Sequence, residues 1–114
     1  MELQYRELDH NIRLIKLIGK LDIAGTIEIE TQFAAYCAGE NARVVVDLSD
    51  VEFLASIGIR LLTLAAKSVM GAGGRMVLLN PNPEVHHVLE VTGIPAIIPI
   101  HPTLASAETG LLAS

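Results

Sequence analysis

Ser56 is the residue whose type and position first suggest chemistry in this sequence. It follows a run of valines at 44–46 and a short loop, and it stands where an amphipathic helix is predicted to begin. The first N–H groups of a helix have no partner within the helix, and the helix dipole favours negative charge there. Because a hydroxyl at this place can carry a phosphate, Ser56 is a candidate phosphorylation site; the alternative is that it serves only as an N-cap of the helix.

Two enzymatic interpretations of the same region fit the sequence poorly. A serine nucleophile on a strand–turn–helix elbow needs glycine two residues before it and two residues after it. Gly58 occupies the second of these places, but Leu54 occupies the first. The glycine-rich segment 71–74 ends a helix and precedes a strand, the reverse of a phosphate-binding loop. Hydrolase activity and nucleotide binding are therefore disfavoured at these positions, and we assign no catalytic residue and no cofactor to them.

Metal chemistry is also disfavoured by the spacing of the candidate ligands. His86 and His87 are adjacent on a predicted helix, about 100° apart, whereas a shared metal needs a spacing such as i and i+4. His86 is expected to face Glu90 instead. Asp47, at the end of a predicted strand, lacks the carboxylate pair and the lysine that a Mg²⁺-dependent phosphoacceptor aspartate requires. We expect Asp47 to accept hydrogen bonds from loop N–H groups and to shape the turn towards Ser56.

The composition indicates one globular domain over residues 1–114. Hydrophobic residues make up 51% and charged residues 18%, and the net charge is −5. The basic residues are scattered, which argues against a nucleic-acid partner. The most apolar segment, 54–70, is interrupted by Arg60 and Lys67, which argues against a membrane span. A single cysteine, Cys37, is expected to pack in the core and fits a reducing compartment, so a cytoplasmic location is expected.

Hydrophobic periodicity and cap residues define the elements that must position Ser56. Strands are predicted at 2–9, 12–18, 43–48, 75–79 and 94–100, and helices at 24–38, 56–70, 83–92 and from Thr103 towards Leu112. Asp22, Asn82 and Thr103 are the predicted N-caps of the first, third and fourth helices. The order β-β-α-β-α-β-α-β-α predicts an α/β fold with a mixed sheet of about five strands and four helices.

The helix after Ser56 is expected to have two distinct faces. Its apolar row is predicted to consist of Ile57, Leu61, Leu64 and Ala65, with Leu62 and Val69 beside it. Its solvent stripe is predicted from the polar side chains Arg60, Thr63 and Lys67, which follow at i, i+3 and i+7.

Several segments together carry a resemblance to a known family. They are residues 19–22 (GKLD), 44–48 (VVVDL), 50–60 (DVEFLASIGIR), 76–80 (MVLLN), 83–91 and 92–94 (TGI). With this combination, the chain resembles the STAS-domain family, specifically the anti-sigma-factor antagonists of bacterial partner-switching systems. The likeness covers nearly the whole chain. The family commonly has Asp before the serine and Ser or Thr after it, whereas this sequence has Ala55 and Ile57.

The resemblance implies a regulatory cycle and not an enzymatic activity of the chain itself. The unmodified protein would bind an anti-sigma factor that is also an ATP-dependent serine kinase. Phosphorylation of Ser56 would release that partner, and a separate serine phosphatase would reset the switch. The resemblance and the solvent stripe together imply a partner-binding set around Ser56: Asp22, Ala24, Ala55, Ile57, Gly58, Ile59, Arg60 and Thr63.

An alternative keeps the fold and omits the phosphorylation. The domain would then be a scaffold or a ligand-binding accessory module, for example of a transport system, with weak nucleotide or lipid binding. Ala55, in place of the family's Asp, favours this alternative.

Overall fold

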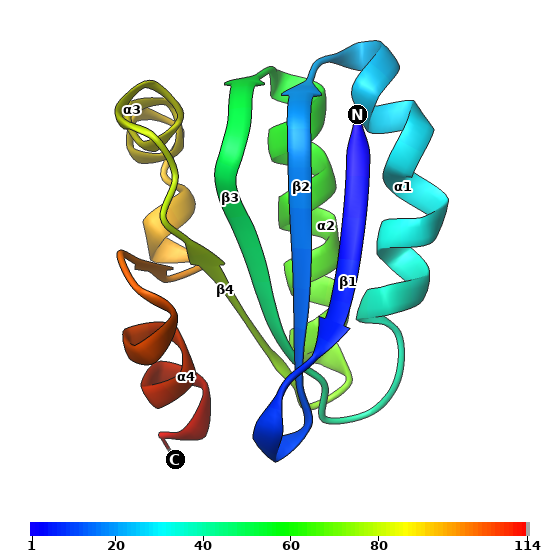
Figure 1. The fold of residues 1–114 in the computed structure, drawn as a ribbon, viewed down its shortest axis with the longest axis vertical. Helices are drawn as coiled ribbons and strands as arrows, with labels where there is room; N and C mark the ends of the chain where they lie inside the picture. Colours follow the sequence, from blue (N-terminus) through cyan, green and yellow to red (C-terminus); the bar gives the residue numbers. More distant parts are fainter. Residues whose placement is uncertain (114) are drawn as a thin grey trace.

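The chain folds around a single mixed β-sheet, and the computed structural model describes residues 1–113 of it. The strands are β1 (Glu2–Glu7), β2 (Ile12–Leu21), β3 (Arg43–Leu54), β4 (Arg75–Leu79) and β5 (Ile100–His101). The α-helices are α1 (Ile23–Cys37), α2 (Ser56–Gly71), α3 (Pro83–Val91) and α4 (Leu104–Leu112), and single 3-10 turns occupy Asp9–Asn11 and Ile94–Ala96. Figure 1 shows the sheet with α2 passing behind β2 and β3.

The sheet has five strands in the order β1-β2-β3-β4-β5. The β1–β2 pair is an antiparallel hairpin, and every later pair is parallel. The α/β class, the mixed sheet and the order of elements are therefore confirmed. The predicted N-caps are also confirmed, because Asp22, Asn82 and Thr103 accept from the N–H groups of Gly25, Val85 and Ser106 at 2.8, 2.8 and 3.1 Å.

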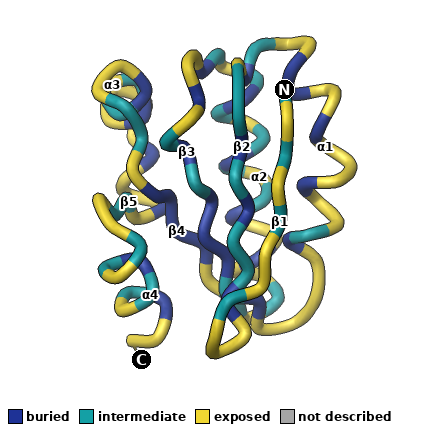
Figure 2. The backbone as a smooth tube through the Cα atoms, in the orientation of Figure 1, coloured by how far each residue is buried: buried dark blue, intermediate teal, exposed yellow. Residues whose placement is uncertain are grey.

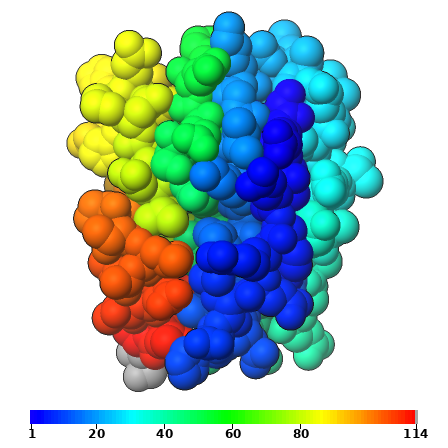
Figure 3. All heavy atoms as spheres, viewed as in Figure 1, coloured from blue at the N-terminus to red at the C-terminus, as the bar shows by residue number. Residues whose placement is uncertain are grey.

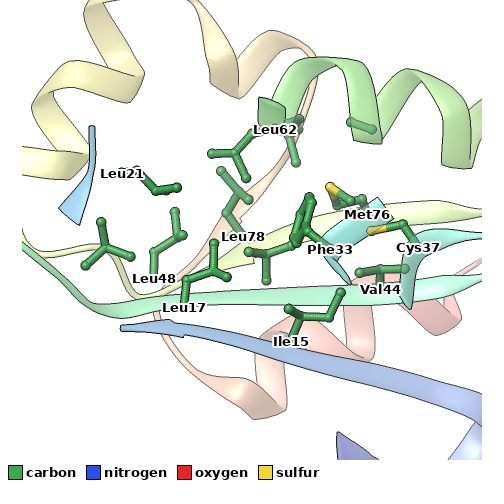
Figure 4. Packing of buried hydrophobic residues seen from close by; sticks show 14 of the residues in the cluster. Ile15, Leu17, Leu21, Phe33, Cys37, Val44, Leu48, Leu62, Met76 and Leu78 are labelled. Atoms are coloured by element: carbon green, nitrogen blue, oxygen red, sulfur yellow. The ribbon is translucent and has the colours of Figure 1, made fainter. Parts of the chain in front are cut away.

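Side chains of the sheet form a core on each of its faces. The larger core joins the sheet to α1, α2 and α3, and its members include Phe33, Val44, Val46, Leu62, Leu78 and Leu89. Figure 4 shows Leu21, Phe33, Leu62 and Leu78 converging in this core. The smaller core lies under α4 and contains Ile12, Val45, Val77, Leu79, Ala107 and Leu111. The three consecutive valines of β3 are buried on both faces of the sheet, because Val45 belongs to the smaller core and Val44 and Val46 to the larger.

The predicted end of β3 at residue 48 is wrong, because the strand continues to Leu54. Its pairing with β2 shifts register between Lys16 and Ile18, and again between Gly19 and Lys20. Each shift places an extra residue in β3 and breaks the two-residue alternation of inward and outward side chains. The segment SDVEF therefore has the pattern of a loop although it is part of the strand.

The predicted strand at 94–100 is also wrong. Residues Ile94–Ala96 form a 3-10 turn, and β5 consists of Ile100 and His101 alone. Pro95 and Pro99 have no N–H to donate to a strand ladder, which explains the short pairing. The buried side chains Ile94 and Ile98 are four residues apart, a spacing typical of a helical turn.

The buried face of α2 runs through Leu62 and Val69, which were predicted to lie beside the apolar row, and it is centred away from the predicted row of Ile57, Leu61, Leu64 and Ala65. The buried residues are Gly58, Leu62, Ala66 and Val69, whereas Leu64 is 54% exposed. A glycine inside the buried row carried no hydrophobic signal, so the row was placed on the larger side chains beside it. Figure 2 shows the contrast between the exposed turns of the helices and the buried middle of β3 and β4.

Candidate functional site

The two longest strands, β2 and β3, project beyond their neighbours at their carboxyl ends. The pairing of β1 with β2 reaches Ile18, and the pairing of β4 with β3 ends at Asp47. Beyond these points β2 and β3 pair with each other up to Leu21 and Leu54. The helices α1 and α2 begin just after this last pair, so their first turns lie at the same edge of the sheet (Figure 1).

Two glycines allow these first turns to approach the strand ends closely. A Cβ atom on Gly25 would lie 2.0 Å from the carbonyl oxygen of Lys20, and one on Gly58 would lie 2.9 Å from Cβ of Leu21. The N–H of Ala55 also donates to the carbonyl oxygen of Leu21 at 3.0 Å. These contacts fix the starts of α1 and α2 against the end of β2.

Ser56 is the first residue of α2, and its side chain is exposed. The residue at the N-cap position is Ala55, and no side chain caps the helix. The N–H groups of Gly58 and Ile59 donate to the carbonyl oxygen of Ala55 at 3.0 and 3.1 Å. Ser56 and Ile57 come before Gly58 in the helix. The N–H groups of these first two residues point out of the start of α2 and add to the positive end of the helix dipole.

The start of α1 is different, because the Asp22 carboxylate caps it. A negative charge already satisfies this terminus, whereas the neighbouring α2 terminus has neither a cap nor an acidic residue in its first turn. A phosphate on the Ser56 hydroxyl would therefore lie at the uncapped terminus, where backbone dipoles favour it.

The predicted partner-binding residues fall into three groups by burial. Ala24 and Arg60 are exposed, and Asp22, Ala55, Ile57, Ile59 and Thr63 are half-buried. Gly58 is buried, so its part at this site is to admit the close packing of α2. The Thr63 hydroxyl donates to the carbonyl oxygen of Ile59 at 2.8 Å, which holds this side chain against the helix.

Three exposed apolar side chains near this edge were not predicted from the sequence. Ile23 and Ile27 of α1 are 66% and 58% exposed, and Phe53 of β3 is 51% exposed. Ile23 and Ile27 are four residues apart, so they share a face of α1, and Phe53 is paired with Lys20 in the strand projection. The sequence does contain a signal for this surface. Ile23 and Ile27 form an apolar pair at i and i+4 that lies outside the buried stripe of Ile29 and Phe33.

Asp47 accepts a hydrogen bond from a backbone N–H, but not in the turn where it was expected. Its Oδ1 atom accepts from the N–H of Ser49 at 2.9 Å, within β3 and next to the first register shift. The expected role in a turn towards Ser56 is therefore wrong. The reason is that the chain has not left the strand here, and Asp47 stabilises the extra residue of a bulge.

The remaining candidates are placed away from this edge or in the core. His86 and Glu90 form the expected pair, with Nδ1 and Oε1 2.9 Å apart. Cys37 is in the core, as predicted, and burial raises the pKa of its thiol to about 11. Among residues 1–113 there is no group of three side chains that could hold a metal ion, and no helix is both long and apolar enough to cross a bilayer.

Comparison with known proteins shows which family the chain is similar to. The family model described as the STAS domain matches residues 5–107. BtrV of Bordetella bronchiseptica, which is assigned to the anti-sigma factor antagonists, is 32% identical over 84 residues, which are 74% of this chain and 72% of that protein.

Two solved structures share the fold. An anti-sigma factor antagonist from Mycobacterium paratuberculosis superposes with a TM-score of 0.88 at 24% identity, over 98% of this chain and 94% of that one. The Bacillus cell fate determinant SpoIIAA in its phosphorylated form superposes with a TM-score of 0.69 at 19% identity, over 96% and 99% of the two chains. At these identities the likeness shows the fold alone.

Proposed function

The chain belongs to the STAS-domain family of anti-sigma factor antagonists, and from this membership we propose that it is a phosphorylation-controlled binding protein. The family is not enzymatic, so the partner supplies the chemistry. In its unmodified form the chain binds an anti-sigma factor that is also a serine kinase. The kinase transfers a phosphoryl group from ATP to the Ser56 hydroxyl and then dissociates. A serine phosphatase hydrolyses the phosphate ester in the cytoplasm and restores binding.

The observation that carries this proposal is the exposed Ser56 hydroxyl at an uncapped helix terminus. A phosphate adds a charge of about −1.5 to −2. The dipole and free N–H groups of α2 stabilise that charge, so the modified chain stays folded. The similarity of the fold to phosphorylated SpoIIAA supports this compatibility. The match of the family model over residues 5–107 likewise supports a single domain spanning residues 1–114.

The proposed partner face surrounds Ser56 on the starts of α1 and α2. It combines the predicted set (Asp22, Ala24, Ala55, Ile57, Ile59, Arg60 and Thr63) with the exposed apolar side chains Ile23, Ile27 and Phe53. Gly58 contributes shape and no exposed surface. Burial of three large apolar side chains against a partner stabilises a complex, because apolar area leaves water.

The same face explains how one phosphate would release the partner. In the complex, the phosphate must lose part of its hydration among apolar side chains, which is costly for a charged group. In the free chain it stays exposed and pays no such penalty. A difference of about 3 kcal/mol would weaken binding by roughly two orders of magnitude, at about 1.4 kcal/mol per tenfold.

The test measures modification and binding with matched serine variants. A candidate anti-sigma factor kinase is incubated with Mg-ATP and the wild type, Ser56→Ala or Ser68→Ala, and intact mass is recorded. Ser68 is an exposed serine of the same helix, so Ser68→Ala should accept one phosphate as the wild type does, and Ser56→Ala none. Calorimetry should then show tight binding of Ser56→Ala and weak binding of Ser56→Asp. Equal affinities of these two variants would show that the switch mechanism is wrong.

A second candidate function is favoured by a hollow on the face of the sheet that carries α4. The hollow has a volume of about 520 Å³ and is lined by Gln4, Arg6, Leu14, Lys16, Asp47, Leu79 and Leu104, among others. Figure 3 views this face, where the N-terminal strands lie beside α4. Together with Ala55, it favours a ligand-binding or scaffold module. An unmodified Ser56 combined with saturable binding of a nucleotide or a fatty acid would support this second function.

A further inference from the structure

The strand that leads to Ser56 loses its neighbour on one side before it ends. The pairing of β4 with β3 stops at the pair Leu79 and Asp47, where the chain turns away towards α3. Beyond this pair, within residues 1–113, only β2 continues beside β3. The backbone of β3 from residue 48 to residue 54 therefore has an edge that no strand covers. Backbone carbonyl groups on such an edge need another partner when they are removed from water.

The Asn82 side chain supplies a partner for one of these carbonyl groups. Its Nδ2 atom donates to the carbonyl oxygen of Val51 at 3.0 Å. Its Oδ1 atom accepts from the N–H of Val85 at 2.8 Å and so caps α3. Only one orientation of the amide satisfies both contacts, because Val85 offers a donor and Val51 an acceptor. One half-buried amide thus ties the projecting part of β3 to the start of α3.

The position of this contact along β3 connects it with Ser56. Val51 lies between the two register shifts of β3 and only five residues before Ser56. Its side chain and that of Val85 are each 1% exposed and belong to the same core. On the other side of β3, the N–H of Ala55 is held by the carbonyl oxygen of Leu21. The end of β3 is therefore fixed from both sides, by β2 and by Asn82.

We propose that Asn82 is a positioning residue for Ser56: the hydrogen bond of its amide to Val51 fixes the end of β3 and thereby the place of the serine at the start of α2. This proposal rests on the proposed function of Ser56 and adds α3 to the elements that support the site. The role lies in the N–H donor of the amide. The oxygen of the same amide performs the separate task of capping the helix.

This division of tasks allows variants that remove one contact and keep the other. Asn82→Asp and Asn82→Ser retain an oxygen that can cap α3, and neither can donate an N–H to Val51. Asn82→Ala removes both contacts. Thr103→Ala is the matched control, because it removes the cap of α4 on the opposite face of the sheet and leaves the end of β3 untouched.

Two measurements test the proposal. Hydrogen–deuterium exchange of the full chain reports the backbone of residues 50–58, and urea unfolding reports global stability. We expect exchange in this segment to be about tenfold faster in Asn82→Asp and Asn82→Ser, since one hydrogen bond to a buried group is lost, with urea midpoints lowered no more than that of Thr103→Ala, which loses a helix cap. With a kinase that modifies the wild type, kcat/KM for Ser56 should fall severalfold in both variants and stay unchanged in Thr103→Ala.

The outcomes separate this proposal from the proposed function. Faster exchange at 50–58 in Asn82→Ser, with unchanged exchange there in Thr103→Ala, supports the positioning role even if no kinase modifies Ser56. A wild-type exchange pattern in both Asn82→Asp and Asn82→Ser would overturn it, whatever happens at Ser56. An equal loss of kcat/KM in Thr103→Ala would also overturn it, because the effect would then follow from helix stability in general.

Discussion

Replacement of Gly25 by alanine tests whether the close approach of α1 to β2 is a requirement of the fold. A Cβ atom at this position would lie 2.0 Å from the carbonyl oxygen of Lys20 and 3.1 Å from Oδ1 of Asp22. The first of these is a backbone atom, so it cannot move aside as a flexible side chain can. The start of α1 must shift, and the N-cap hydrogen bond from Gly25 to Asp22 must weaken.

The magnitude follows from three opposing terms. Overpacking costs about 1–3 kcal/mol or more, and the weakened cap costs about 1 kcal/mol. Alanine regains up to about 1 kcal/mol through its higher helix propensity. We expect Gly25→Ala to lower the free energy of unfolding by about 2 kcal/mol or more, which is a large part of the roughly 5–15 kcal/mol of a typical domain.

Urea unfolding followed by circular dichroism measures this loss against a matched control. Gly71 is also a helical glycine, and a Cβ there would meet nothing within 4 Å. Gly71→Ala should therefore leave the midpoint unchanged or raise it. With a slope of about 1–3 kcal/mol per molar urea, the Gly25→Ala midpoint should fall by about 1 M. If Gly25→Ala unfolds at the wild-type midpoint, the close approach of α1 to Lys20 is not a feature of the folded protein.

Three further predictions concern the core, the thiol and the serine. Leu62→Ala should lower the free energy of unfolding by about 2–5 kcal/mol, and Leu64→Ala by about 0.5 kcal/mol or less, because Leu62 is fully buried and Leu64 is 54% exposed; urea unfolding measures both. Since burial raises the pKa of Cys37 to about 11, the native thiol should resist iodoacetamide at pH 8 and react in urea; the stability gained from the neutral thiol should decline as pH rises from about 8.5 towards 11. Ser56→Asp should keep or raise the melting temperature, because a negative charge at a helix start is worth about 0.3–1 kcal/mol.

The sequence contains most of the information that places Ser56 at the start of a helix. Three N-caps follow from residue type alone, because Asp, Asn and Thr offer an oxygen to the first N–H groups of a helix. The burial of 44–46 follows from three valines without alternation. These local signals were enough for the order of elements, and hence for the edge of the sheet at which α1 and α2 begin.

The errors arise where tertiary contacts override the local pattern. The extension of β3 depends on two bulges in its pairing with β2, and no residue type within 49–54 indicates a bulge. The expected role of Asp47 failed for the same reason, since the side chain stabilises a bulge and not a turn. The amide of Asn82 was predicted as a cap, whereas its second contact to Val51 exists only because β4 ends early.

The exposed apolar side chains show a different limit of sequence reasoning. Ile23 and Ile27 precede the buried stripe of α1, and a hydrophobic residue at a helix start is expected to be buried more often than not. Their exposure depends on Gly25, which lets the opposite face of the first turn contact β2. The position of α1 on the sheet, and not its composition, therefore creates the apolar surface near Ser56.

The arrangement at this edge separates the stability of the fold from the stability of a complex. The Asp22 side chain caps α1, so the start of this helix does not depend on any charge added nearby. The start of α2 is held by backbone contacts of Ala55 to Leu21 and by the packing of Gly58, none of which uses the Ser56 hydroxyl. A charge added to that hydroxyl meets helix N–H groups in the free chain, and in the proposed complex it would meet desolvated apolar side chains. The first interaction is favourable and the second costly, so a modification of Ser56 can change the binding affinity without unfolding the domain.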